Sequence, residues 1–263
     1  MNQTWLYISL IILVSISALF LTSCIVEQPS SLYYVTKVLD GDTIKIQYKG
    51  EIVSVRYIGI DTPETHAGSK PVGEFGTVAA NYNEQLISES GWKVGIVARG
   101  YDYYGRLLAY VYMKDDKMIN EEIIRNGLAR PLTYENTSEH SKDFKNAYCE
   151  AYYNRRGIFS KYDSAKVIDA SVVKNNLTPF YYGGYLGKII WLKFTVTYAY
   201  KYKFGGSDAI VEIRDEEAGL FFSADPNFYQ YLGKEIKVYG EIWEEDGKPK
   251  ILLRAPFEIE VIE

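Results

Sequence analysis

The chain has 263 residues, of which 47% are hydrophobic and 24% are charged. This composition is typical of a globular protein with one or two domains and excludes a disordered chain. The formal net charge of −5 excludes a strongly basic nucleic-acid binder. Residues 31–162 nevertheless carry 17 Lys or Arg and 17 Asp or Glu, and a neutral half of this kind can still focus positive potential in one cleft.

The first 26 residues carry no charged side chain, and the mostly apolar run Trp5–Leu21 indicates an export signal or a membrane anchor. Leu21-Thr22-Ser23-Cys24 looks like the site at which bacterial-type lipoproteins are cleaved and lipidated on the cysteine. Because residues 1–4 contain no Lys or Arg, a retained transmembrane helix and a signal cleaved without lipid stay open as alternatives. We therefore expect a protein at the cell membrane, lipid-anchored at Cys24 or single-pass, with its folded domains outside the cytoplasm. Residues 27–33 are predicted to be a tether.

A first domain is predicted over residues 34–162. Apolar alternation predicts five strands within residues 33–60, 93–98 and 107–113. Helices are predicted over residues 77–89 with Thr77 as N-cap, over 118–126 and over 138–154. Five strands with interleaved helices are the order of an OB-fold five-stranded barrel with capping helices, which is a mainly β (α+β) fold.

The rest of the chain is predicted to hold a linker and a second β domain. Residues 163–186 are polar and weakly patterned, as expected of a linker. Residues 187–263 predict an OB-like β-barrel, with another small barrel or a sandwich as the alternative. Its strands are predicted within residues 188–200, 210–214, 219–224, 235–244, 249–253 and 257–262. Tyr198, Tyr200, Tyr202 and Phe204 alternate there, which is typical either of a stacking platform for single strands or of an aromatic barrel face.

Four charged motifs follow one another in the first domain. They are Asp40-Gly41-Asp42-Thr43, Arg56, Asp61-Thr62-Pro63-Glu64 and Tyr104-Gly105-Arg106. Two carboxylates with a backbone carbonyl suit a hard cation such as calcium, a third carboxylate can serve as general base, and two guanidinium forks can hold a phosphate. Each motif by itself is a common turn or surface sequence, so the prediction of phosphodiester hydrolysis rests on their joint occurrence.

In identity, order and spacing, these residues resemble the staphylococcal nuclease (thermonuclease) family over about residues 34–160, roughly half of the chain. The resemblance implies that Asp42, Asp61 and the Thr62 carbonyl bind Ca²⁺. It implies that Arg56 and Arg106 bind phosphate and stabilise its charge in the transition state. Glu64 would act as general base or hold the attacking water in line.

Two tyrosines are further candidates by the same resemblance. Tyr104 matches a tyrosine that contacts the nucleotide phosphate, and Tyr134 lies near the tyrosines that pack on the base, about one position out of register. Tyr103 departs from the family pattern, which has a lysine at this position. We expect this difference to remove one phosphate contact without preventing the chemistry.

These expectations combine into an exported, membrane-anchored, calcium-dependent nuclease of low sequence specificity. Its substrate would be DNA, with RNA as a further candidate, and the resemblance implies 3′-phosphate ends. No protein partner is evident from the sequence. The alternatives are a catalytically inactive nucleic-acid-binding surface lipoprotein and a structural or adhesion lipoprotein.

Three remaining polar residues are predicted to have no catalytic role. With Cys24 in the signal, Cys149 is left as a single thiol, and its place in a helical pattern predicts a packed side chain. His66 and His140 lack metal-ligand spacing and have polar neighbours in the sequence, so both are predicted to be solvated.

Overall fold

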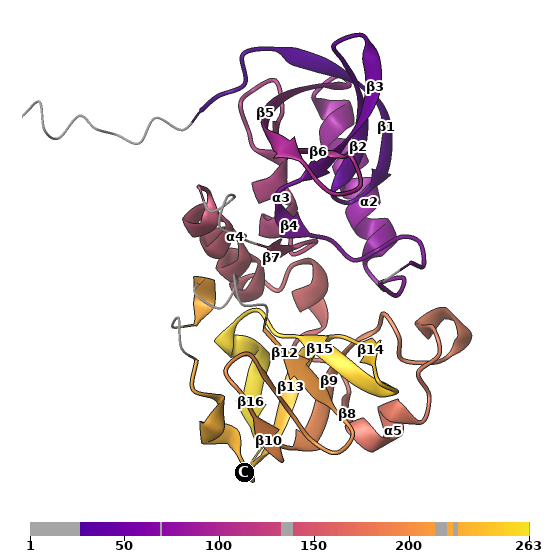
Figure 1. Ribbon diagram of the computed structural model, residues 1–263, viewed down its shortest axis with the longest axis vertical. Helices are drawn as coiled ribbons and strands as arrows, with labels where there is room; N and C mark the ends of the chain where they lie inside the picture. The colour runs from indigo at the N-terminus through magenta and orange to yellow at the C-terminus, as the bar shows by residue number, and fades with distance from the viewer. Residues whose placement is uncertain (1–26, 69, 133–138, 214–219, 223–225, 263) are drawn as a thin grey trace, which may run out of the picture.

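The computed structural model describes residues 27–68, 70–132, 139–213, 220–222 and 226–262. Figure 1 shows two β-rich units arranged along the long axis, the first unit (residues 27–162) at the top and the second unit (residues 163–262) at the bottom. The N-terminal apolar segment, Cys24 and Tyr134 lie outside the described residues. Within the part of the chain that is described, no helix is long and apolar enough to cross a membrane.

The first unit is a closed barrel of five strands in the order β1-β2-β3-β6-β5. Strands β3 and β6 pair in parallel, and the other neighbours are antiparallel. This arrangement confirms the predicted five-stranded barrel of OB type. Its elements are β1 (Leu32–Asp40), β2 (Thr43–Tyr48), β3 (Glu51–Tyr57), β4 (Gly59–Asp61), α2 (Gly76–Glu89), β5 (Lys93–Tyr101), β6 (Leu107–Tyr112), α3 (Ile119–Arg125), β7 (Arg130–Leu132), α4 (Ser141–Tyr153) and a 3₁₀ turn, η2 (Gly157–Lys161).

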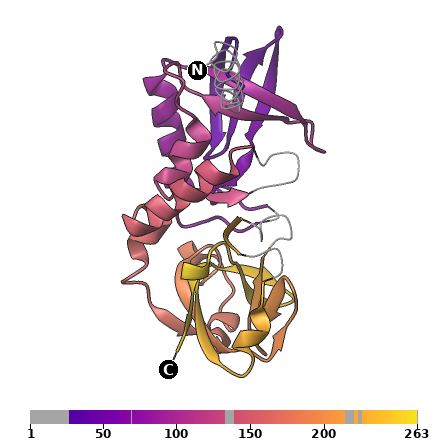
Figure 2. The ribbon, with the colours of Figure 1, turned by 90° about the vertical axis from the view of Figure 1, so that its left-hand side faces the viewer.

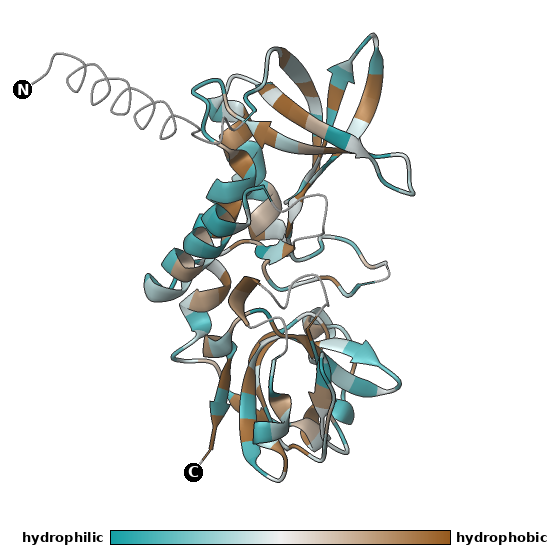
Figure 3. Ribbon diagram, turned by 60° about the vertical axis from the view of Figure 1, so that its left-hand side comes forward, coloured by the Kyte–Doolittle hydropathy of each residue, from teal (hydrophilic) through white to brown (hydrophobic). Residues whose placement is uncertain are grey.

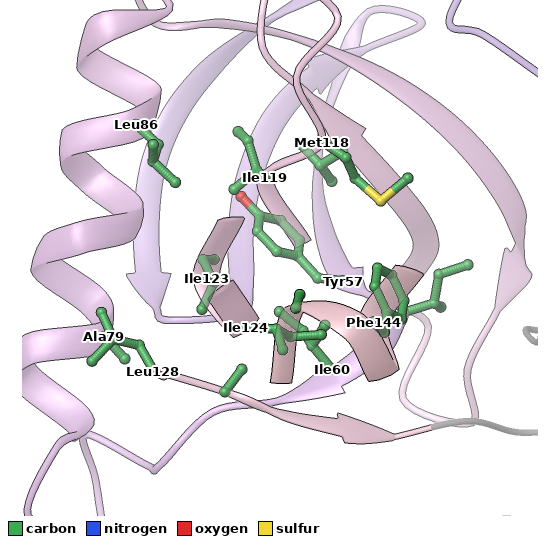
Figure 4. Close-up of a cluster of buried hydrophobic side chains, with 14 of the residues drawn as sticks. Tyr57, Ile60, Ala79, Leu86, Met118, Ile119, Ile123, Ile124, Leu128 and Phe144 are labelled. Carbon is green, nitrogen blue, oxygen red and sulfur yellow. The ribbon is translucent and has the colours of Figure 1, made fainter. Parts of the chain in front are cut away.

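The core of the first unit lies between the barrel and its helices (Figure 4). Ile119 and Ile123 of α3, one turn apart and therefore on one helix face, pack with Tyr57 of β3, and all three are at most 1% exposed. The Tyr57 hydroxyl donates to Asn83 Oδ1 (3.0 Å), and Asn83 Nδ2 donates to the Asp40 carbonyl (3.0 Å). Helix α2 is thereby joined to the end of β1, where the first acidic motif lies.

Helix α2 begins without the predicted cap. It starts at Gly76 with Phe75 as N-cap residue, and no side chain caps it. Thr77 therefore lies within the first turn, and its prediction as N-cap is wrong. The end of this helix agrees with the expectation, since Gly91 follows with a positive φ of 64°.

The second unit consists of a five-stranded sheet, β10-β11-β12-β15-β14, and a four-stranded sheet, β16-β13-β9-β8. As in the first barrel, an antiparallel run (β10-β11-β12) closes on a parallel pair (β12-β15). This pairing resembles that of the first barrel, but it is divided between two sheets, so the OB-like barrel stays a prediction. Its elements are β8 (Val167–Asp169), α5 (Ala170–Lys174), η3 (Phe180–Tyr182), β9 (Ile189–Thr195), β10 (Tyr198–Ala199), β11 (Lys203–Gly205), β12 (Ile210–Glu212), η4 (Phe228–Tyr231), β13 (Glu235–Glu241), β14 (Trp243–Glu245), β15 (Lys248–Leu252), η5 (Pro256–Glu258) and β16 (Ile259–Val261).

Two expectations about the second half differ from the structure. The segment 163–186, expected to be a linker, contains β8 and α5, and β8 pairs in parallel with β9. A strand was expected over 219–224, but Leu220 and Phe221 are helical, and residues 219, 223 and 224 lie outside the described residues. The division of the chain into domains stays a prediction.

The alternating aromatics of residues 198–204 do not form a stacking platform on one strand. They belong to the hairpin of β10 and β11, in which Tyr198 pairs with Gly205. Phe204 is fully buried and stacks on Phe228 with ring centroids 4.7 Å apart, whereas Tyr200 is exposed. Phe204 therefore agrees with the alternative prediction, an aromatic face inside the barrel.

The two units share one aromatic core. Phe159 of the first unit is 0% exposed and packs on Tyr239 and Phe257 of the second. Hydrogen bonds cross the same interface, from Trp191 Nε1 to the Tyr162 carbonyl (2.9 Å) and from the Tyr239 hydroxyl to the Ile158 carbonyl (2.5 Å). Figure 3 shows hydrophobic residues recurring along the strands of both units, and Figure 2 shows the same two-unit arrangement from the side. The units are therefore packed together rather than loosely tethered.

Candidate active site

An open cleft of about 950 Å³ lies on the first unit and collects the predicted catalytic residues. The acids, the arginines and the candidate phosphate contact come from four separate segments of the chain. Thr62 adjoins Asp61 but faces a second, smaller pocket between the units. The predicted residues that line the cleft are Asp42, Arg56, Asp61, Glu64, Tyr104 and Arg106.

Asp42 and Asp61 are both buried, each 6% exposed, at strand ends. Asp42 lies in the β1–β2 turn, directly before β2, and its Oδ2 accepts hydrogen bonds from the backbone N and the hydroxyl of Thr62, both at 2.9 Å. Gly41 makes this approach possible through lack of a side chain and not through a positive φ, since a Cβ there would lie 2.8 Å from Thr62 and Ala79. Hydrogen bonds thus hold the Asp40–Thr43 motif and the Asp61–Glu64 motif together.

Arg56 of β3 links these two carboxylates. Its Nη1 lies 2.9 Å from Asp42 Oδ2, and its Nη2 lies 3.5 Å from Asp61 Oδ1. The same nitrogens donate to the carbonyls of Tyr57 and Ile60, each at 3.0 Å. The guanidinium is therefore fixed in a fork that faces the cleft.

Lys70, which the sequence reasoning missed, also reaches the acids. Its Nζ lies 2.5 Å from Asp61 Oδ1 and 3.2 Å from Glu64 Oε1. Burial by itself raises the pKa of Asp61, but Lys70 and then Arg56 outweigh it and lower this pKa to about 2. Glu64 is more open, with its side chain 34% exposed at the edge of the cleft. Asp61 thus stays ionised and able to hold a cation.

Arg106 is oriented by Asp102, a second residue that the motif analysis left out. Asp102 Oδ2 accepts from Arg106 Nε (2.7 Å), and Oδ1 accepts from the backbone N of Tyr104 and of Arg106, both at 2.9 Å. An Asp three residues before Gly105 is a turn signal that could have identified it. Tyr103 and Tyr104, 98% and 81% exposed, lie beside Arg106 along the cleft.

Asp40 adds a further carboxyl to the cleft that was not among the predicted site residues. Its Oδ1 accepts from the backbone N of Asp42 at 3.1 Å. Burial, followed by repulsion from the Asp42 carboxylate, raises the pKa of Asp40 to about 7. Asp40 therefore holds a proton more readily than an ordinary carboxyl, because a second negative charge beside Asp42 is unfavourable.

The second unit contributes Glu241 and Trp243 to the smaller pocket, beside Asp61, Glu64 and Lys70. The Trp243 indole Nε1 donates to Glu241 Oε1 at 2.9 Å, and Lys70 Nζ lies 5.5 Å from the Trp243 ring centroid. Burial raises the pKa of Glu241 to about 7, although Arg130 opposes the shift. Sequence reasoning missed both residues because they lie far along the chain in a unit without chemical motifs.

The raised pKa of Glu241 predicts a pH-dependent stability. The folded protein holds this proton up to pH about 7, whereas the unfolded chain releases it near pH 4.5, so the free energy of unfolding should fall as pH rises between these values. Glu241→Gln, which keeps an acceptor for Trp243, should remove that contribution. Urea unfolding at pH 4 and pH 8 should show the variant gaining stability over the wild type at pH 8 only. An equal difference at both pH values would contradict the shift.

Cys149, His66 and His140 are the three residues that were predicted to have no catalytic role. Cys149 is a free, partly buried thiol on α4 whose pKa is raised by burial, as a packed side chain requires. His66 is exposed, as predicted. His140 is 5% exposed and packs edge-on against Tyr110 with ring centroids 4.5 Å apart, so its predicted solvation is wrong. The aromatic contact buries it despite its polar neighbours in the sequence.

The OB barrel and the acidic, arginine-flanked cleft together define a site of staphylococcal nuclease type. Residues 54–161 match the family model "Staphylococcal nuclease homologue". The chain is 34% identical over 129 residues to a thermonuclease of Staphylococcus intermedius, and the match covers 49% of this chain and 76% of that protein. The chain belongs to the staphylococcal nuclease family, as the motifs predicted.

Two further relatives come from Bacillus subtilis. The SPbeta prophage-derived endonuclease YokF is 38% identical over 127 residues, and endonuclease YncB is 36% identical over 127 residues. The match covers 48% of this chain in both cases, but only 43% of YokF and 60% of YncB. The match thus covers about half of this chain and less than two thirds of either relative, so these relatives do not describe the whole chain.

Proposed function

We propose that this protein is a nuclease that hydrolyses phosphodiester bonds of DNA, and of RNA as a second substrate, with low sequence specificity. One observation carries the proposal: two buried carboxylates, a more open glutamate and two arginines from separate segments line one open cleft. The printed functions of its relatives, two endonucleases and a thermonuclease, agree with this chemistry. An inactive binding module would not need this set of residues.

Each of these residues has a separate role in the proposed hydrolysis. The fixed fork of Arg56 and the guanidinium of Arg106, each held by a carboxylate, are placed to bind phosphoryl oxygens and to stabilise the charge that grows on them. Glu64 can take a proton from the attacking water or hold that water in line. Tyr104, beside Arg106, can contact the phosphate. No sequence-specific contact is needed, because all of these groups address the backbone of the substrate.

The predicted donor set, two carboxylates of the cleft and the carbonyl of the adjoining Thr62, fits calcium. Asp42, Asp61 and the Thr62 carbonyl offer only oxygen ligands, which calcium prefers, and water would complete the coordination. Within the described residues, no group of three or more His, Cys, Asp or Glu side chains is placed to hold a metal ion. The proposed calcium site therefore rests on the two carboxylates and the Thr62 carbonyl. The ammonium of Lys70 already lies between Asp61 and Glu64, which marks this position as one that attracts a cation. Bound calcium would supply positive charge next to the phosphate.

The remaining parts of the proposal concern location and products. The apolar segment before residue 27 and the Leu21-Thr22-Ser23-Cys24 sequence support export and attachment to the cell membrane, by lipid at Cys24 or by a retained helix. Calcium is plentiful outside the cytoplasm, and the chromosome is absent there. Family membership supports products with 3′-phosphate ends.

Glu64→Gln should abolish cleavage while leaving the fold intact, because the amide cannot accept the proton. The full-length protein in mild detergent is incubated with supercoiled plasmid, single-stranded DNA and RNA, in calcium, in magnesium and with a chelator. We expect calcium-dependent degradation by the wild type and a loss of about 100-fold or more in the variant. End-labelling before and after phosphatase treatment then identifies the terminal phosphate.

Two outcomes would contradict the proposal. Retention of nucleic acid without cleavage in any metal would assign the protein to the inactive binding class. Undiminished cleavage by Glu64→Gln would assign the activity to a different residue or to a contaminant. Glu84→Gln, an exposed glutamate on α2, is the matched control and should keep full activity.

A further inference from the structure

The loop that carries Glu64 lies between the two units. It joins β4 to α2, and Figure 1 shows it running down from the first barrel to the second. Its middle is shaped by local contacts: the backbone N of Gly73 donates to the Glu64 carbonyl at 2.9 Å, and Glu64 bridges to Val72. We call residues 62–68 and 70–75 the Glu64 loop. Such a segment, without helix or long strand, needs outside contacts to hold one conformation.

Glu74 supplies the main outside contacts of the Glu64 loop. Its backbone N donates to the Gly187 carbonyl at 2.8 Å, and its Oε2 accepts from the backbone N of Ile189 at 3.1 Å. Its Oε1 accepts from Lys161 Nζ at 2.7 Å, at the end of the first unit. One side chain therefore joins the loop, the last turn of the first unit and the first residue of β9 in the second unit.

Close backbone packing adds to these bonds. A Cβ at Gly187 would lie 1.8 Å from the Val72 carbonyl oxygen. A Cβ at Gly73 would lie 2.5 Å from Pro63 and 2.8 Å from Glu241 Oε2. The loop is thus in direct contact with the second unit at Val72 and Gly73, the two residues before Glu74, with no room for a further side chain there.

The second unit also touches the part of the loop that faces the cleft. The Trp243 ring lies 5.5 Å from Lys70 Nζ, and Lys70 in turn contacts Glu64 and Asp61. Trp243 of β14 is therefore linked to the Glu64 carboxylate through one side chain, that of Lys70.

From these contacts we infer that the second unit is a positioning device for the catalytic site, and that Glu74 is the positioning residue through which it holds the Glu64 loop. That Glu74 holds the loop does not depend on the proposed nuclease function; only the expected effect on the rate of cleavage rests on it. A general base must be held close to its working geometry, because a displacement of about 1 Å can cost on the order of 100-fold in rate. The second unit holds the Glu64 loop in one conformation through contacts from outside the first barrel.

The test compares Glu74→Ala and Glu74→Gln with wild type, using the full-length protein in mild detergent. Gln keeps an oxygen for the backbone N of Ile189 but loses the ion pair with Lys161, so it should be the milder variant. Glu84→Ala on α2, with the same change at an exposed position, is the matched control. Amide hydrogen exchange is followed by mass spectrometry without substrate, and kcat and KM are measured on single-stranded DNA with calcium.

In Glu74→Ala we expect exchange in residues 64–68 and 70–75 to become about tenfold faster, with the barrel strands unchanged, which shows that the fold is kept. We expect kcat to fall by about 10- to 100-fold, KM to change by less than about threefold, and Glu74→Gln to restore part of the loss. Unchanged exchange in the loop would overturn the inference, and so would faster exchange with undiminished kcat. If the wild type cleaves nothing, the proposed function fails, while the exchange data still decide whether Glu74 holds the loop.

Discussion

Replacing Arg106 with lysine should lower kcat by about 100- to 1,000-fold while leaving the protein folded. Lysine keeps the charge but loses the planar fork that can bind two phosphoryl oxygens at once. It also loses the Nε–H that Asp102 Oδ2 accepts at 2.7 Å, so the charge would no longer be aimed at the cleft. Removal of one preorganised donor to a developing oxyanion typically costs about 3 kcal/mol, and that cost appears in kcat. Steady-state cleavage of a short DNA substrate measures it.

The control is the same replacement outside the cleft. Arg99 of β5 pairs with Glu139 and Glu27 on the surface of the same barrel, so Arg99→Lys tests the general effect of losing a guanidinium. We expect its kcat to stay within about twofold of wild type. Arg106→Lys with nearly unchanged kcat would show that its guanidinium does not act on the transition state.

Replacing Phe159 with alanine should destabilise both units together. Phe159 is 0% exposed and its ring packs on Tyr148 and Tyr152 of the first unit and on Tyr239 and Phe257 of the second. Deleting a buried phenyl ring costs about 3–5 kcal/mol through lost burial and the cavity left behind. Urea unfolding followed by tryptophan fluorescence and by circular dichroism should shift by the same amount in one transition.

The matched control is Tyr103→Ala, because Tyr103 is 98% exposed. Its free energy of unfolding should stay within about 0.5 kcal/mol of wild type. Two separate transitions, of which Phe159→Ala shifts only one, would show that the aromatic core does not couple the units.

The first barrel and most of its site could be predicted from the sequence because their signals are local. The five strands alternate visibly, and Asp42, Asp61 and Arg106 lie in short motifs with recognisable spacing. Gly41 is required by close packing against Thr62 and Ala79 and not by an unusual φ. Such a packing constraint has no signal in a single sequence.

The missed features all depend on tertiary contacts. Lys70 is one lysine in an irregular loop, and only the folded chain brings it to Asp61. Trp243 and Glu241 approach the site because the second unit packs against the first. His140 is buried through its contact with Tyr110, and β8 has only three residues, too few to show an alternating pattern. Periodicity and motifs contain no information about these pairings.

The shared aromatic core also determines how the chain can be shortened. A protein ending after residue 162 would keep every catalytic motif, yet it would present Tyr148, Phe159 and Tyr162 to water where Trp191, Tyr239 and Phe257 now cover them. A contiguous apolar surface of this kind promotes association and attack by proteases. We therefore expect the first unit to depend on the second, and a fragment ending at residue 162 should associate and be cut by proteases more readily than the full chain.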